Sequence, residues 1–239
     1  MSALSYSLKS GNSEHQRVLE ICCASLECVI AADAGGADRI ELCENLEVGG
    51  ITPSRTLFKE ARRATALPIF PLVRCRAGDF RFTRQEIAEM TEQIEQMREI
   101  GADGIVSGAL NKEGKIDLAA TAGFIEAAGP LPFTFHRAFD ELDDFVGGVA
   151  QLRELGVERI LSSAGLTRAS DEPERLKKLV VHAGQKPLLL ACGGIRSVNI
   201  GALAPVEDIK EFHSAATGAG SGVDEDEVRA IQRALMGDR

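Results

Sequence analysis

Acidic, basic and imidazole side chains stand inside or directly after apolar, strand-like segments of this 239-residue sequence, as in residues 134–140 (TFHRAFD). A strand buried on both faces should be almost wholly apolar, and a buried charge without a partner is costly, so these side chains indicate one shared polar cavity. Carboxylates and imidazoles suit proton transfer or a divalent cation, whereas an arginine suits the carboxylate or phosphate of a substrate. The candidate catalytic residues are Glu20, Glu41, Arg74, His136, Glu211 and His213.

The segments that would position these residues alternate eight times between strand and helix patterns. Strand-like runs occupy residues 18–24, 39–43, 69–74, 104–109, 133–138, 159–163, 188–192 and 209–214. Helix-period segments occupy residues 26–34, 52–64, 83–100, 118–128, 145–155, 172–182, 197–203 and 224–235. Eight alternations predict an α/β fold, the closed parallel (β/α)8 barrel of the TIM type. An open doubly wound sheet is the alternative, and the lack of a G-x-G-x-x-G motif after the first strand disfavours it.

The barrel fold predicts where the polar residues meet. Active sites of such barrels lie at the C-terminal ends of the strands, on the loops that lead into the helices. Alternate residues of a strand share a face, so Glu211 and His213 point the same way. Because charged groups favour the face that reaches a cavity, we assign all six candidates to the barrel interior and to one mouth.

Glycine-rich loops follow the seventh and eighth predicted strands, with the sequences CGGIRS (192–197) and SAATGAGSG (214–222). In TIM barrels this position commonly binds a phosphate through backbone N–H groups. Gly193, Gly194 and Ser214 are therefore candidate anion-binding residues. Ordinary turn chemistry is the alternative explanation of these glycines.

Composition bounds the class of protein. The length fits one barrel domain at residues 18–239 after a flexible tail at 1–17. Thirty-six acidic against 27 basic residues give a formal net charge of −9, which argues against nucleic acid and anionic membrane as partners. The sequence contains no apolar run of membrane-spanning length and no signal-peptide pattern, so a cytoplasmic location is expected. The six cysteines include no C-x-x-C pair, which disfavours a structural zinc site.

Several motifs resemble those of the CutC family, whose members are described as copper-homeostasis proteins. The motifs are LEICCASLE, GGADRIELC followed by GGITPS, RAGDF, TFHRAFD and EFHSAA, and they occur in the family's order from about residue 19 to residue 216. The resemblance implies a TIM-like barrel, a cytoplasmic location and a homodimer or higher homo-oligomer. It also implies association with copper at the two cysteines that match the family's pattern, Cys22 and Cys43.

The residues leave three functions open. Thiolates select Cu(I), and Cys22 and Cys43 belong to consecutive strands about 4.8 Å apart, although both thiols could equally pack inertly. The second function is acid–base catalysis on a small carboxylated or phosphorylated substrate, which Arg74 favours because a copper carrier has no use for it. The third is a structural role in an oligomer, with buried Glu–Arg pairs that merely neutralise each other.

Overall fold

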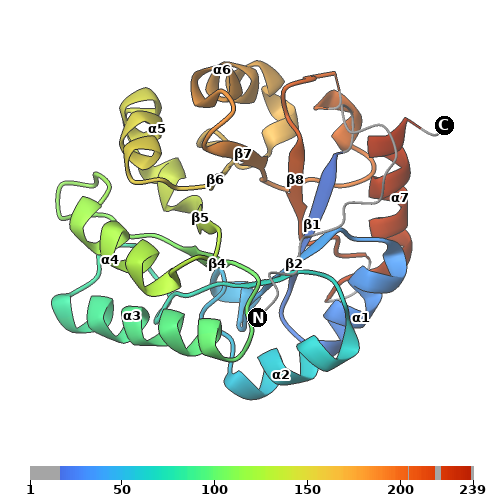
Figure 1. Cartoon of the computed structure of the whole chain (residues 1–239). Coiled ribbons are helices and arrows are strands. Elements are labelled where there is room, and N and C mark those ends of the chain that lie inside the picture. Colours follow the sequence, from blue (N-terminus) through green and yellow to red (C-terminus); the bar gives the residue numbers. More distant parts are fainter. Residues whose placement is uncertain (1–16, 204, 219–221, 238–239) are drawn as a thin grey trace.

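The computed structural model describes residues 17–203, 205–218 and 222–237. The predicted N-terminal tail lies outside these residues, apart from Arg17. Eight parallel strands form one sheet in the order β3-β2-β1-β8-β7-β6-β5-β4. A parallel bridge between Leu72 and Val106 joins the two ends of this order, so the sheet is a nearly closed barrel surrounded by helices (Figure 1). The predicted TIM-type fold is confirmed.

All eight predicted strands are present, and in the part of the chain that the structure describes an α-helix follows each strand except β7. The strands are β1 (Val18–Cys23), β2 (Arg39–Leu42), β3 (Ile69–Pro71), β4 (Ile105–Ser107), β5 (Phe133–Phe135), β6 (Arg159–Ser162), β7 (Leu188–Ala191) and β8 (Glu211–Ser214). The α-helices of the described residues are α1 (Leu26–Gly35), α2 (Arg55–Ala64), α3 (Arg84–Glu99), α4 (Leu118–Ala128), α5 (Phe145–Glu154), α6 (Pro173–Ala183) and α7 (Glu225–Met236). None of these helices has the length and apolar character that crossing a bilayer would require.

The predicted helix at 197–203 is wrong, because this segment contains only the short 3-10 turn η4 (Ile200–Ala202). Seven residues that include Asn199 and Gly201 are too few and too poor in helix propensity to repay helix nucleation. The side chain of Asn199 instead accepts from the Arg196 amide at 2.8 Å and donates to the Gly194 carbonyl at 2.9 Å. The segment therefore braces the loop after β7.

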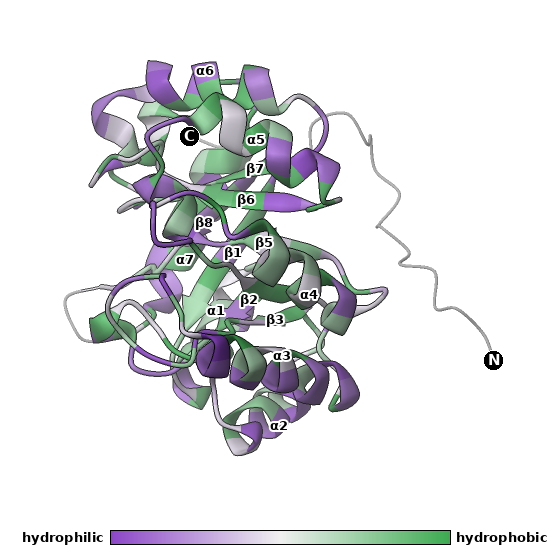
Figure 2. Cartoon of the chain, turned by 90° about the vertical axis from the view of Figure 1, so that its left-hand side faces the viewer, coloured by the Kyte–Doolittle hydropathy of each residue, from purple (hydrophilic) through white to green (hydrophobic). Residues whose placement is uncertain are grey.

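The helices begin close to the strand ends because polar side chains cap them. The side chains of Ser25, Thr83 and Asp224, for example, accept hydrogen bonds from first-turn amides of α1, α3 and α7. Hydrophilic and hydrophobic residues alternate along α3 and α6, as expected of helices that cover a barrel (Figure 2). Each cap fixes where the preceding loop ends and thus the shape of the mouth.

The strand register arranges the inward side chains in four levels, each formed by alternate strands as in other TIM barrels. We number the levels from the N-terminal to the C-terminal ends of the strands. Level one holds Arg39, Gly104, Arg159 and Glu211; level two holds Glu20, Phe70, Thr134 and Leu190; level three holds Glu41, Val106, Leu161 and His213; level four holds Cys22, Leu72, His136 and Cys192.

Levels one and two form a closed base. The guanidinium carbons of Arg39 and Arg159 lie 5.1 and 5.4 Å from the centre of the Phe70 ring. A Cβ atom at Gly104 would lie 2.4 Å from that ring, so only glycine leaves room for it. The aromatic ring and the two basic side chains thus fill the lower half of the barrel.

Candidate functional site

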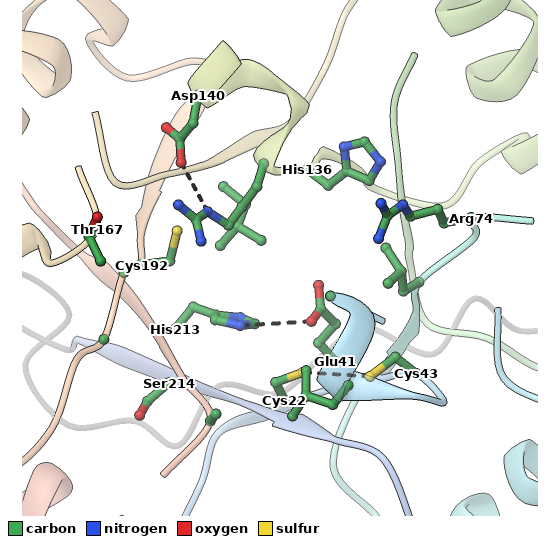
Figure 3. A pocket seen from close by; sticks show the side chains of 18 of the residues that line it. Cys22, Glu41, Cys43, Arg74, His136, Asp140, Thr167, Cys192, His213 and Ser214 are labelled. Atoms are coloured by element: carbon green, nitrogen blue, oxygen red, sulfur yellow. Dashed lines mark hydrogen bonds and ion pairs between the residues drawn. The ribbon is translucent and has the colours of Figure 1, made fainter. Parts of the chain in front are cut away.

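A cavity of about 690 Å³ opens at the C-terminal ends of the strands, where the fold predicts an active site (Figure 3). Its walls come from levels three and four and from the loops after β2, β3, β5, β6, β7 and β8. Nine residues predicted from the sequence line it, namely Cys22, Glu41, Cys43, Arg74, His136, Gly193, Gly194, His213 and Ser214. Glu20 and Glu211 do not line it, because they lie at levels two and one.

These two deeper acids belong to an ion-pair network that Arg39 holds together. Arg39 Nε donates to Glu20 Oε2 at 2.5 Å, and Arg39 Nη2 donates to Glu211 Oε2 at 2.5 Å. Arg159 Nε lies 3.0 Å from the same Glu211 oxygen. Burial alone would raise the pKa of Glu20, but the charge of Arg39 and the hydrogen bond with His213 outweigh it and lower the pKa to about 2. Glu20 is therefore ionised at neutral pH.

His213 connects this network to the cavity floor. Its Nδ1 donates to Glu20 Oε1 at 2.7 Å. Its Nε2 lies 3.8 Å from Glu41 Oε2 (Figure 3). Burial lowers the pKa of His213, but the negative charges of Glu41 and Glu20 and the hydrogen bond with Glu20 raise it by more, so the pKa lies above its usual value. Burial raises the pKa of Glu41 against the opposing effect of His213. The floor thus presents a close acid–imidazole pair that can exchange a proton with a ligand.

Two thiols lie beside this pair. Cys22 Sγ and Cys43 Sγ are 3.7 Å apart, and the donor atoms of Cys22, Glu41 and His213 all lie within 4.8 Å of one another. The hydrogen bond with Cys43, burial and the charge of Glu41 raise the pKa of Cys22 well above its usual value. Cys22 is therefore protonated at neutral pH, and a metal ion would have to displace that proton.

The distance of 3.7 Å between Cys22 Sγ and Cys43 Sγ suits two sulfur ligands of one metal ion. Two metal–sulfur bonds of about 2.3 Å at a tetrahedral angle span about 3.8 Å, whereas a linear arrangement would span about 4.6 Å. The thiols of Cys22 and Cys43 thus suit bent coordination, which leaves room for a further donor. His213 Nε2 can be that donor, because Glu20 occupies its other ring nitrogen in the manner typical of histidine ligands.

The wall beyond β3 contains Arg74, a cation without a carboxylate partner within the residues that the structure describes. Arg74 donates to the carbonyls of Val48, Gly50 and Gly78 at 3.3, 3.1 and 2.5 Å, and its guanidinium lies 4.7 Å from the centre of the Phe80 ring. Among the described residues it forms no ion pair, and its buried Nε has no hydrogen-bond partner. An anionic ligand would supply the missing charge.

His136 completes this wall as a neutral hydrogen-bond donor. Its Nδ1 accepts from the Ala138 amide at 3.3 Å, which places the ring proton on Nε2. Nε2 is buried and has no partner among the described residues. Burial and the nearby charge of Arg74 lower the pKa of His136 to about 3, so the ring does not become charged near neutral pH.

The opposite wall contains the predicted anion-binding residues and one arginine that the sequence interpretation missed. Gly193 and Gly194 have φ values of +98° and +62°, and a Cβ atom at Gly193 would lie 2.7 Å from Ser163 Cβ. The Ser214 hydroxyl is used internally, since it donates to the Ile195 carbonyl at 2.6 Å. Arg196 also lines the cavity. Its position in CGGIRS, directly after a predicted strand end, was the signal that could have identified it.

Arg137 and Asp140 line the rim as an ion pair. Arg137 Nε donates to Asp140 Oδ2 at 3.0 Å, and the same carboxylate accepts from the hydroxyls of Ser162 and Ser163. With so many donors, Asp140 is held rigidly and neutralises Arg137. The rim therefore differs from the walls, where Arg74 and Arg196 have no carboxylate partner in the described ranges.

Comparisons with known proteins match a single family over most of the chain. A family model described as the CutC family matches residues 17–218. A CutC family protein of Klebsiella pneumoniae (strain 342) is 43% identical over 199 residues, which cover 83% of this chain and 80% of the relative. A solved structure from Streptococcus agalactiae, described as a candidate copper homeostasis protein CutC, has a TM-score of 0.79 and 29% identity and covers 84% of this chain and 99% of its own. A thiamine phosphate pyrophosphorylase from Pyrococcus furiosus, with a TM-score of 0.63, 15% identity and coverage of 95% of this chain and 99% of its own, shares the fold.

Proposed function

Since the chain belongs to the CutC family and its barrel ends in a polar cavity, we propose that this cavity is the active site of an enzyme that transfers a proton on a small anionic substrate. One observation carries the proposal. The same wall contains the Arg74 guanidinium and the His136 Nε2 atom, and among the described residues the first has no carboxylate partner and the second has no hydrogen-bond partner. Buried polar groups are normally satisfied, so their counterpart is a ligand oxygen.

The roles of the predicted residues follow from their levels. Arg74 binds a carboxylate or phosphate, and His136 donates to a carbonyl or anionic oxygen that gains charge during the reaction. Glu41 accepts or returns the proton, supported by His213.

Glu20 and Glu211 do not touch the substrate and act as positioning residues. Glu20 acts through its hydrogen bond with His213, and Glu211 acts through Arg39.

Proton transfer to and from carbon can be tested without a known substrate. The protein is incubated with small keto and hydroxy acids, free and phosphorylated, in D2O, and proton NMR follows the loss of C–H signals. We expect exchange with at least one compound, a loss of about 100-fold in Glu41→Gln, and a KM increase of about tenfold in Arg74→Gln. The exposed Arg63→Gln serves as the control and should leave the rate unchanged. Binding of these compounds that is indifferent to Arg74→Gln would contradict the proposal.

Cu(I) binding by Cys22 and Cys43 is the second candidate function, and the sulfur separation of 3.7 Å with an imidazole nearby favours it. In this alternative, copper is the ion that the protein binds in its role in copper homeostasis. We expect the double variant Cys22→Ser/Cys43→Ser to lose at least about 100-fold in Cu(I) affinity in a competition titration, because thiolates provide the soft donors. Cys28→Ser/Cys75→Ser, with two half-buried cysteines, is the matched control. An equal affinity in both double variants would eliminate this function.

We also propose a cytoplasmic location and assembly into a homodimer or higher homo-oligomer. The family resemblance and the acidic composition support these proposals. Sedimentation at micromolar concentration that gave only the monomer mass would contradict the assembly, and fractionation that recovered the protein outside the cytoplasm would contradict the location.

A further inference from the structure

We propose that the substrate carries two anionic groups, one bound by Arg74 and the other by Arg196 together with the Gly193–Gly194 loop. This inference rests on the proposed function, because it specifies the substrate class of the same cavity. The chemical class is a small molecule with a carboxylate or phosphate at each end.

Among the described residues, Arg196 resembles Arg74 in having only neutral partners. It donates to the Ile195 carbonyl at 2.8 Å, to Ser214 Oγ at 3.2 Å and to Thr217 Oγ1 at 2.6 Å. No carboxylate of the described residues lies within ion-pair distance of Arg196. Arg137, in the same cavity, is neutralised by Asp140. The chain has nine more acidic than basic residues. Two guanidinium groups in one cavity that lack a carboxylate partner in the described part of this chain therefore indicate an anionic ligand.

The Gly193–Gly194 loop adds neutral donors beside Arg196. The amides of Gly193 and Gly194 make no hydrogen bond within the part of the chain that the structure describes, although both residues line the cavity. Their carbonyls are occupied, one by the Ala169 amide at 3.0 Å and the other by the Asn199 side chain at 2.9 Å. The loop is thus held by its acceptors, while its donors are left for a ligand.

The barrel topology places the two cations on opposite sides of the mouth. Arg74 follows β3 and Arg196 follows β7, and these strands are four positions apart in a ring of eight. The Glu41–His213 pair lies on the floor between the two walls (Figure 3). A ligand that reaches both cations therefore places its central atoms over the acid–imidazole pair. A volume of about 690 Å³ is ample for a small molecule of this kind.

Calorimetric titration with a length series of phosphonoalkanoates tests the inference, with methylphosphonate and acetate as references that have one anionic group each. We expect the best phosphonoalkanoate to bind the wild-type protein at least about tenfold more tightly than either reference, because the second contact is intramolecular. Arg74→Gln and Arg196→Gln should each remove this advantage, and Arg63→Gln should keep it. Arg196→Lys retains the positive charge and should keep part of the affinity advantage. That result would show that the loop after β7 is still folded in a variant of this position.

The outcomes separate this inference from the proposed function. Weakened binding of all anions in Arg74→Gln, with no effect of Arg196→Gln or Arg196→Lys on the two-ended probes, would overturn the second anion site and leave the proposed function intact. If none of these anions binds the wild-type protein, both fail.

Discussion

Replacement of Arg39 by methionine is expected to lower the free energy of unfolding by about 3–5 kcal/mol. The variant would leave Glu20 without its strongest ion pair and Glu211 with only Arg159, in a part of the barrel where Glu20 is 0% and Glu211 6% exposed. A buried charge that loses its main partner is costly, because water cannot reach it to replace that partner, and His213 and Arg159 make up only part of the loss. Urea unfolding at pH 7 measures the change.

Arg229→Met is the matched control for this experiment. Arg229 also pairs with two acids, Glu225 and Asp226, but on the exposed surface of α7, so its removal should cost less than about 1 kcal/mol. Arg39→Lys keeps the charge but not the two-sided geometry and should fall between wild type and Arg39→Met. Equal losses of unfolding free energy in Arg39→Met and Arg229→Met would show that the buried ion pairs of Arg39 stabilise the protein no more than surface ion pairs do.

Acidification should destabilise the protein through Glu20. Its pKa is lowered from 4.5 to about 2 in the folded state, so its stabilising contribution is complete above pH 4.5 and is lost as the pH falls through about 2. The difference corresponds to about 3 kcal/mol. Urea unfolding between pH 6 and pH 2 should therefore show a steeper loss in wild type than in Glu20→Gln.

Two comparisons make the acid experiment specific. Glu41 acts in the opposite direction, because protonation of a carboxyl with a raised pKa relieves the cost of its buried charge. The difference between wild type and Glu20→Gln, rather than the wild-type curve alone, thus reports on Glu20. The exposed Glu95→Gln should parallel wild type. Parallel curves for wild type and Glu20→Gln would contradict the lowered pKa.

The fold could be predicted because its signals are local. Apolar runs of strand length, helix-period segments and the turns between them recur eight times, and one architecture accommodates that order. The exception at 197–203 arises because hydrophobic spacing cannot show that the side chain of Asn199 will bind the loop instead of starting a helix turn.

The site could be predicted only in part because alternation along a strand gives the face of a residue but not its level in the barrel. Glu20 and Glu41 both face inward, yet the register of β1 with β2 puts Glu20 one level below Glu41. Glu211 lies lower still, since it opens β8. Level depends on the stagger between strands, which no single strand encodes. Arg196 was missed for a related reason, because its side chain returns to the cavity from a loop that has no regular period.

The hydrogen-bonded series Arg39–Glu20–His213 starts in the closed base of the barrel and ends 3.8 Å from Glu41 at the cavity floor. In the proposed function, the same residues therefore hold the barrel together and set the chemistry of the cavity floor. A substitution of Glu20 or Arg39 that changed the pKa of His213 or Glu41 would also lower the stability of the barrel. We therefore expect changes of substrate specificity on this architecture to come from the loops at the rim, and substitutions at Arg39 and Glu20 to be rare.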